Sequence, residues 1–170
     1  WNGVVPHFRG CSGEPNRLPR AYHAGDADEL DWILERLAAR HPDVPRFAAG
    51  VSLGGNALLV WLGTRGSAAG RHLQAAAAIC APLDLAAMGH HLGRGVNRLY
   101  TRHFLATLKA RALAKLRQHP GLFDPAAVRR ARNLHAFDDL VTAPLHGFRG
   151  SDDYWRRASS KPLLPAITVP

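Results

Sequence analysis

Short apolar runs alternate with helical hydrophobic spacing along the first half of the chain. Residues 4–8 form a β-prone run that ends in a turn with two glycines, which predicts a strand followed by a loop. Residues 26–42 repeat leucine and isoleucine at helical spacing, with acidic residues in the first turn and a proline at the end, which predicts a helix. Residues 46–51 predict a strand that turns sharply into a helix over residues 56–62, and residues 75–80 predict a second buried strand.

The second half of the chain lacks this alternation, because residues 83–161 contain only patterns that predict helices. These signals fall in residues 100–118, 124–134, 139–146 and 151–159. Strands that alternate with helices predict a parallel sheet, and a helical block of this size predicts a cap inserted over that sheet. Residues 164–169 then resemble the start of another core strand.

We therefore predict an α/β class, with a parallel sheet core and an inserted helical cap. Residues 1–82 are predicted to form a partial core, residues 83–161 the helical cap and residues 162–170 the start of the next strand. A parallel sheet is normally covered and completed. The pattern therefore leads us to expect a chain that is truncated at both ends.

The composition of the chain limits the classes of protein to which it can belong. The chain has 170 residues, 46% hydrophobic and 21% charged, which is typical of a globular domain. Its longest nearly continuous apolar run, residues 75–83, is too short to span a bilayer, and the first residues contain no signal-peptide pattern. Two distant cysteines predict free thiols and a cytoplasmic protein, with Cys11 in a loop and Cys80 buried in a strand.

The net charge of +9 raises the question of a polyanionic partner. Because the basic residues are spread along predicted helix faces, a solvated surface is the favoured explanation, and weak attraction to an anionic membrane surface is the alternative. The turn at residues 9–13 resembles the Gly-x-x-Gly clamp of a nucleic-acid module but lacks its context. We expect no nucleic-acid partner.

The run Gly50-Val51-Ser52-Leu53-Gly54 matches the Gly-x-Ser-x-Gly nucleophile elbow. In such an elbow a serine at a strained strand-to-helix turn exposes its hydroxyl, and glycines let the two backbones approach. The helix behind it directs free N–H groups at the site. We therefore predict Ser52 as the nucleophile and the Leu53 N–H as one oxyanion donor. The alternative is a glycine-rich turn that serves packing only.

Several segments together resemble the YheT-like α/β-hydrolases. They are residues 8–17, 22–25, 50–56 and 137–143, with Asp153 and Tyr154. The resemblance implies hydrolysis of a small-molecule carboxylic ester, or transfer of its acyl group, with Ser52 as the nucleophile and no cofactor or metal. It also implies that the triad acid, the triad histidine and the second oxyanion donor lie outside these residues. A non-catalytic binding module, or an inactive fragment, is the alternative.

Other candidate residues favour structural roles. His90 and His91 are adjacent and so cannot form the i, i+4 metal pair. Chain order argues against a catalytic base among the histidines of the predicted cap, which are His103, His119, His135 and His146. Asp138 and Asp139 favour helix capping or surface charge. Six apolar residues of the cap offer a surface for an acyl chain of short to medium length: Leu92, Leu99, Phe104, Leu105, Leu108 and Leu116.

Overall fold

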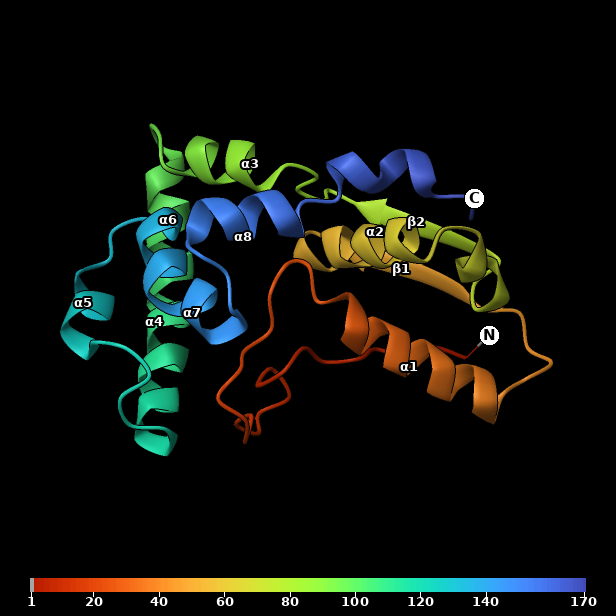
Figure 1. Cartoon of the computed structure of the whole chain (residues 1–170), viewed down its shortest axis with the longest axis horizontal. Coiled ribbons are helices and arrows are strands. Elements are labelled where there is room, and N and C mark those ends of the chain that lie inside the picture. The colour runs from red at the N-terminus through yellow and green to blue at the C-terminus, as the bar shows by residue number, and fades with distance from the viewer. Residues whose placement is uncertain (1) are drawn as a thin grey trace. The chain divides into compact units, whose positions relative to one another are not determined.

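The computed structural model describes residues 2–170, which divide into two compact units (Figure 1). One unit contains residues His23–Leu85 and Arg157–Pro170 and carries the sheet. The other contains the residues up to Tyr22 together with Ala86–Arg156 and is helical.

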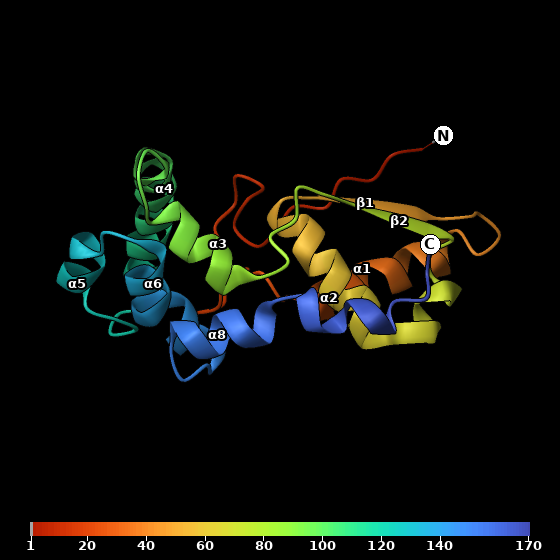
Figure 2. The same ribbon diagram turned by 90° about the horizontal axis from the view of Figure 1, so that it is seen from above.

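The sheet unit is built on two parallel strands, β1 (Phe47–Val51) and β2 (Ala75–Ile79). Phe47 pairs with Ala75 at one end of the register and Val51 with Ile79 at the other. Its helices are α1 (Ala27–Arg40) and α2 (Leu53–Arg65), with the 3-10 helices η1 (Gly66–Arg71) and η3 (Lys161–Ala166). Helix α2 packs against both strands and against α1 (Figure 2). The core of this unit contains Leu34, Leu58, Trp61, Leu62, Ala69, Leu73 and Val169.

The predicted order of helix, strand, sharp turn, helix and strand over residues 26–80 is confirmed. The predicted burial of the second strand is wrong, since the side chains at its carboxyl end are exposed. Helix α2 covers one face of the sheet, while Phe47, Val51 and Ile79 are 56%, 62% and 48% exposed. The two cysteines are free thiols, as predicted, but Cys80 is exposed rather than buried for the same reason.

Two further strand predictions are wrong. Residues 4–8 form no strand, and Val4 and Val5 are 61% and 83% exposed, so this run lacks the neighbouring strand that would make its β-propensity effective. Residues 164–166 belong to η3 and residues 167–169 follow it without forming a strand. Pro162 and Pro165 have no N–H to donate to a ladder. At the end of this segment the Ala76 N–H donates to the Pro170 carbonyl at 2.8 Å, and Val169 packs in the core of the sheet unit.

The other unit is helical, as the sequence predicts for residues 83–161. Its elements are α3 (Leu85–Leu92), α4 (Asn97–Gln118), α5 (Pro125–Arg130), α6 (Leu134–Phe137), the π-helical turn η2 (Asp138–Thr142), α7 (Ala143–His146) and α8 (Ser151–Ala158). They enclose a second core of Leu105, Ala112, Val128, Ala131, Phe137 and Val141. The Lys115 ammonium of α4 donates to the Asn16 and Leu18 carbonyls, which attaches the N-terminal loop to this helix. No helix within residues 2–170 combines the length and the apolar character that a membrane crossing requires.

Candidate active site

The turn between β1 and α2 places Ser52 in an unusual backbone conformation. Its φ of 51° and ψ of −120° lie in a region that residues with a Cβ adopt only at an energetic cost of about 1–3 kcal/mol. The Ser52 N–H donates to the Ile79 carbonyl at 2.8 Å, which extends the pairing of the strands by one residue. The side chain is exposed. The structure therefore holds the Ser52 hydroxyl at the carboxyl end of the sheet.

Two glycines permit this turn. A Cβ on Gly50 would lie 2.6 Å from the Gly54 carbonyl oxygen and 2.7 Å from the Gly55 Cα. A Cβ on Gly55 would lie 2.8 Å from the Gly50 carbonyl oxygen and 2.9 Å from the Ala81 Cβ. Since most of these atoms are backbone, no side-chain adjustment could make the room. The strand and the helix cross here at a separation that only glycine allows.

Helix α2 begins directly behind Ser52. The N–H groups of Gly55 and Asn56 donate to the Ser52 carbonyl, at 3.0 and 3.2 Å. The N–H groups of Leu53 and Gly54 precede the first hydrogen bond of the helix, so they have no acceptor within it. Together with the positive end of the helix dipole, they provide an environment that stabilises negative charge. Leu53 itself is partly buried.

The Ser52 hydroxyl makes no hydrogen bond to any residue in the range 2–170. The nearest histidine along the chain in this unit, His41, lies eleven residues away in sequence, at the end of α1. His23 has another contact, because its Nδ1 accepts a hydrogen bond from the Gly25 N–H at 3.2 Å. Within residues 2–170, the structure thus forms the elbow without a general base hydrogen-bonded to the Ser52 hydroxyl.

Asn56 anchors the start of α2, and the sequence analysis missed it. Its side chain is completely buried, and its Nδ2 donates to the carbonyls of Ala24 and Ala158 at 2.9 and 2.8 Å. Its Oδ1 accepts from the Ser160 N–H at 3.0 Å. Every polar group of the amide is therefore used to join three segments that are distant in sequence. The sequence signal for this role is a single asparagine at the start of an otherwise apolar helical run.

The predicted structural roles of several histidines agree with their contacts. The His119 Nε2 lies 2.9 Å from the Arg17 carbonyl oxygen. His90 and His135 each pack edge-on against Trp155, with ring centroids 5.9 and 5.3 Å apart. These contacts lie within the helical unit and hold its elements together.

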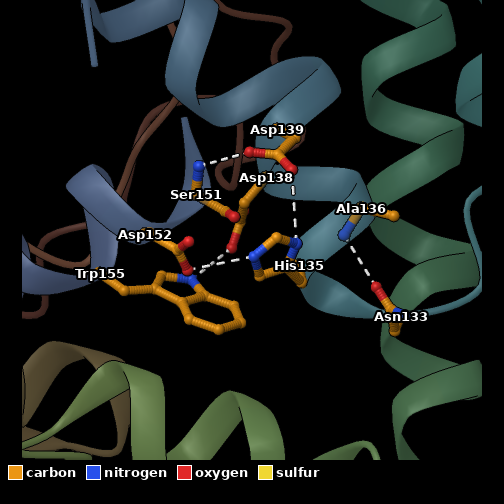
Figure 3. Close-up of polar contacts among 8 residues, drawn as sticks. All are labelled: Asn133, His135, Ala136, Asp138, Asp139, Ser151, Asp152 and Trp155. Carbon is orange, nitrogen blue, oxygen red and sulfur yellow. Dashed lines mark hydrogen bonds and ion pairs between the residues drawn. The ribbon is translucent and has the colours of Figure 1, made fainter. Parts of the chain in front are cut away.

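Asp138 and Asp139 have different roles, and they lie in a polar cluster around Trp155 (Figure 3). Asp139 caps α8, since its carboxylate accepts from the Ser151 N–H at 2.5 Å, and it also faces the His135 Nδ1 at 3.3 Å. The Asp138 carboxylate points inward and accepts from the Trp155 Nε1 at 2.8 Å and from the Thr142 hydroxyl at 2.6 Å. Capping was the right interpretation for Asp139, whereas surface charge was wrong for Asp138.

Burial raises the pKa of Asp138 from its ordinary value of 3.8 to about 6. The hydrogen bonds from Thr142 and Trp155 and the charge of His135 oppose this shift, whereas the charge of Asp139 adds to it. Because the pKa is higher in the folded state, the folded state binds the proton more tightly than the unfolded state. The stabilising contribution is therefore complete below about pH 4 and is lost as the pH rises through about 6.

Asp138→Asn should remove this pH dependence. We expect the free energy of unfolding of the wild type, relative to the variant, to fall between about pH 4 and about pH 6 and then to level off. Urea unfolding at a series of pH values measures this difference. Asp43→Asn, at an exposed aspartate in a turn, is the matched control and should change the pH profile little. A constant difference between wild type and Asp138→Asn across this range would contradict the assignment.

The chain is similar in sequence to known hydrolases. The chain is 31% identical to Phospholipase ABHD3 of Homo sapiens, over 98% of this chain and 41% of that protein. It is 24% identical to the Monoacylglycerol lipase of Saccharomyces cerevisiae, over 100% of this chain and 39% of that protein. Such relatives are members of the α/β-hydrolase family, and a helix-rich structure with a small parallel sheet is compatible with that fold.

Within this class, the predicted resemblance to the YheT-like hydrolases is confirmed. The chain is 41% identical to YheT of Escherichia coli (strain K12), which carries a provisional esterase name, over 100% of this chain and 50% of that protein. The chain spans about half the length of the curated relatives it matches. No protein-family model and no solved structure matches it.

Proposed function

We propose that the protein is a serine hydrolase of carboxylic esters, in which Ser52 is the nucleophile and the Leu53 N–H is one of the oxyanion donors. The observation that carries the proposal is the backbone of Ser52, which has a positive φ and an exposed hydroxyl at the start of a helix. A packing turn would favour glycine at such a position. The strained backbone conformation is kept at Ser52 although the residue is not glycine, which indicates that the serine hydroxyl has a function.

In the proposed reaction, the Ser52 Oγ attacks the ester carbonyl carbon while a general base accepts its proton. The negative charge that develops on the carbonyl oxygen is stabilised by the Leu53 N–H and by the positive end of α2. The alcohol then leaves with a proton, and water or another alcohol takes the acyl group from Ser52. The resemblance to the YheT-like hydrolases implies that the base and its acid partner come from outside residues 1–170. The absence of any hydrogen bond to the Ser52 hydroxyl from residues 2–170 supports this.

Small-molecule esters are the proposed substrates, because the named relatives include a phospholipase and a monoacylglycerol lipase. A cytoplasmic location and the absence of nucleic-acid partners remain part of the proposal, and the two free thiols agree with the former.

The ester specificity is a direct test. We expect the full-length protein to hydrolyse p-nitrophenyl esters of medium chain length faster than the acetate. The apolar residues predicted to contact the acyl chain differ in burial. Leu105 lies in the core of the helical unit, whereas Leu99 and Phe104 are exposed. Values of kcat/KM across a series of chain lengths measure the preference. Equal or faster turnover of acetate would contradict an acyl-binding cap, and no turnover of any ester would contradict the proposed function.

Residues 1–170 alone should show no measurable esterase activity. Without a base in reach, a serine hydroxyl stays protonated and is a poor nucleophile. Loss of one oxyanion donor lowers rates by a further factor of about 10²–10³. The chain and the full-length protein should be assayed side by side, each also as Ser52→Ala. Activity of the chain that disappears with Ser52→Ala would show that the base lies within it, with His23 and His146 the first to substitute.

A non-catalytic binding module is the second candidate, favoured by the absence, among residues 2–170, of a base hydrogen-bonded to the Ser52 hydroxyl. The two candidates differ in the full-length protein. A binding module predicts no hydrolysis and no covalent labelling of Ser52 by a fluorophosphonate probe, whereas a serine hydrolase predicts both. Denaturing the protein before labelling is the control, because the reaction requires an activated hydroxyl.

A further inference from the structure

The strained backbone of Ser52 is attached on both sides of the turn. On the strand side, the Ser52 N–H donates to the Ile79 carbonyl at 2.8 Å. On the helix side, the Asn56 N–H donates to the Ser52 carbonyl at 3.2 Å. A strained conformation persists only where the surrounding contacts hold it. The turn therefore depends on what holds Asn56 in place.

The side chain of Asn56 attaches the first turn of α2 to two other segments of the sheet unit. It is completely buried. Its Nδ2 donates to the carbonyls of Ala24 and Ala158, and its Oδ1 accepts from the Ser160 N–H, with distances between 2.8 and 3.0 Å. Since all three partners are backbone groups, their directions are set by the chain and not by a side-chain rotamer. Asn56 is thereby fixed in orientation as well as in position.

One of these segments, residues 158–161, also holds the chain that follows β2. The Ser159 hydroxyl accepts from the Leu85 N–H at 2.9 Å in a buried contact. The Lys161 N–H donates to the Leu83 carbonyl at 2.9 Å. The segment therefore connects the start of α2 to the chain beyond the second strand, and all of these residues belong to the sheet unit.

A role in stability alone is the alternative, since Asn56 supplies partners to backbone groups inside the unit. Such a role could be met at many positions of a core. This asparagine, however, is the residue whose own N–H binds the carbonyl of the strained Ser52. Hydrogen bonds are directional, unlike apolar contacts. The contacts of Asn56 therefore set the orientation of the turn beside Ser52, and not only the packing of the helix.

We propose that Asn56 is a positioning residue for ester hydrolysis at Ser52, an inference that rests on the proposed function. Asn56 touches none of the reacting atoms. By holding the first turn of α2, it keeps the Ser52 Oγ and the Leu53 N–H at the separation that the transition state requires. Catalytic groups have to stay within about 0.5 Å of the productive geometry. A misplacement of about 1 Å lowers rates by as much as about 10²-fold.

The kinetic constants of Asn56→Ala in the full-length protein test the proposal. We expect kcat to fall by about 10²-fold while KM changes by less than about threefold, because the reacting groups move but the binding of the ester is kept. Asn56→Ser keeps a hydroxyl at the γ position, so its kcat should lie between those of Asn56→Ala and the wild type. Circular dichroism shows whether each protein is folded at the assay temperature, and Asn56→Ser replaces Asn56→Ala if the latter is not.

Trp61→Phe is the matched control. Trp61 is also buried in α2, and its Nε1 donates to the Asp31 carboxylate at 2.9 Å. The variant therefore loses a side-chain hydrogen bond of the same helix, further along the chain from Ser52. We expect its Tm to fall while its kcat stays within about twofold of the wild-type value.

A double-mutant cycle provides a readout that does not depend on activity. Ser52→Gly relieves the backbone strain, so it should lower the equilibrium constant for unfolding by about fivefold where Asn56 holds the turn. In the Asn56→Ala or Asn56→Ser background the turn is free to relax, and the same substitution should change this constant by less than about twofold. Urea unfolding of the single and double variants measures these constants.

Three outcomes would overturn the proposal: a wild-type kcat in folded Asn56→Ala, an equal loss of kcat in Trp61→Phe, or the same effect of Ser52→Gly in both backgrounds. Asn56 would then contribute to stability alone. Failure of the wild type to hydrolyse any ester would contradict the proposed function instead. In that case the unfolding cycle would still decide whether Asn56 holds the backbone of Ser52.

Discussion

Ser52→Ala in the full-length protein is expected to lower the rate of ester hydrolysis by about 10⁴–10⁶-fold. The substitution removes one oxygen atom and leaves the backbone of the elbow in place. The loss of activity would therefore result from the missing nucleophile and not from a change of fold. The measurement is kcat/KM for the best p-nitrophenyl ester, with the variant purified separately from the wild type. Ser67→Ala is the matched control, because Ser67 is also exposed but lies in η1, and it should keep full activity.

Ser52→Gly adds a readout that activity alone does not provide. Glycine adopts a φ of 51° without the cost that a Cβ imposes, so this variant should be as inactive as Ser52→Ala yet more stable than wild type by about 1 kcal/mol. Thermal melting of the three proteins measures the difference. Hydrolysis that persists in both variants would show that another residue is the nucleophile.

Gly50→Ala should damage both the fold and the activity. Its Cβ would lie 2.6 Å from the Gly54 carbonyl oxygen, and relief of this overlap requires the strand and the helix to separate. We expect a decrease of about 3 kcal/mol in the free energy of unfolding, together with a large loss of esterase activity as Ser52 and the Leu53 N–H move apart. Urea unfolding and kcat/KM provide the two measurements.

Gly70→Ala is the control for this experiment. A Cβ at Gly70 meets no atom within 4 Å, and the residue lies in η1, away from the elbow in sequence. This variant should retain the stability of the wild type to within about 1 kcal/mol. If Gly50→Ala behaved in the same way, the close approach of β1 and α2 would not be what holds Ser52 in place.

Several elements of this protein follow from sequence alone, because the forces that form them act over a few residues. The spacing of Leu30, Ile33, Leu34 and Leu37 produces α1, and the glycines around Ser52 permit the strand-to-helix turn. The parallel pairing of β1 and β2 also follows, because a helix connects them. The motif at residues 50–54 and the YheT-like resemblance therefore follow from the sequence alone.

Contacts between distant segments decided the rest. Whether residues 4–8 or 164–169 form strands depends on neighbours that a local pattern does not contain, and the exposure of Cys80 depends on which face of the sheet α2 covers. Asn56 is an anchor only because Ala24, Ala158 and Ser160 meet at its amide. Asp138 has a raised pKa because packing buries its carboxylate, and the hydrogen bond from Trp155, seventeen residues later, opposes that shift. Interactions over a few residues thus shape the turn at Ser52. Burial and polar pairing depend instead on contacts between distant segments, since the solvation of a side chain depends on everything around it.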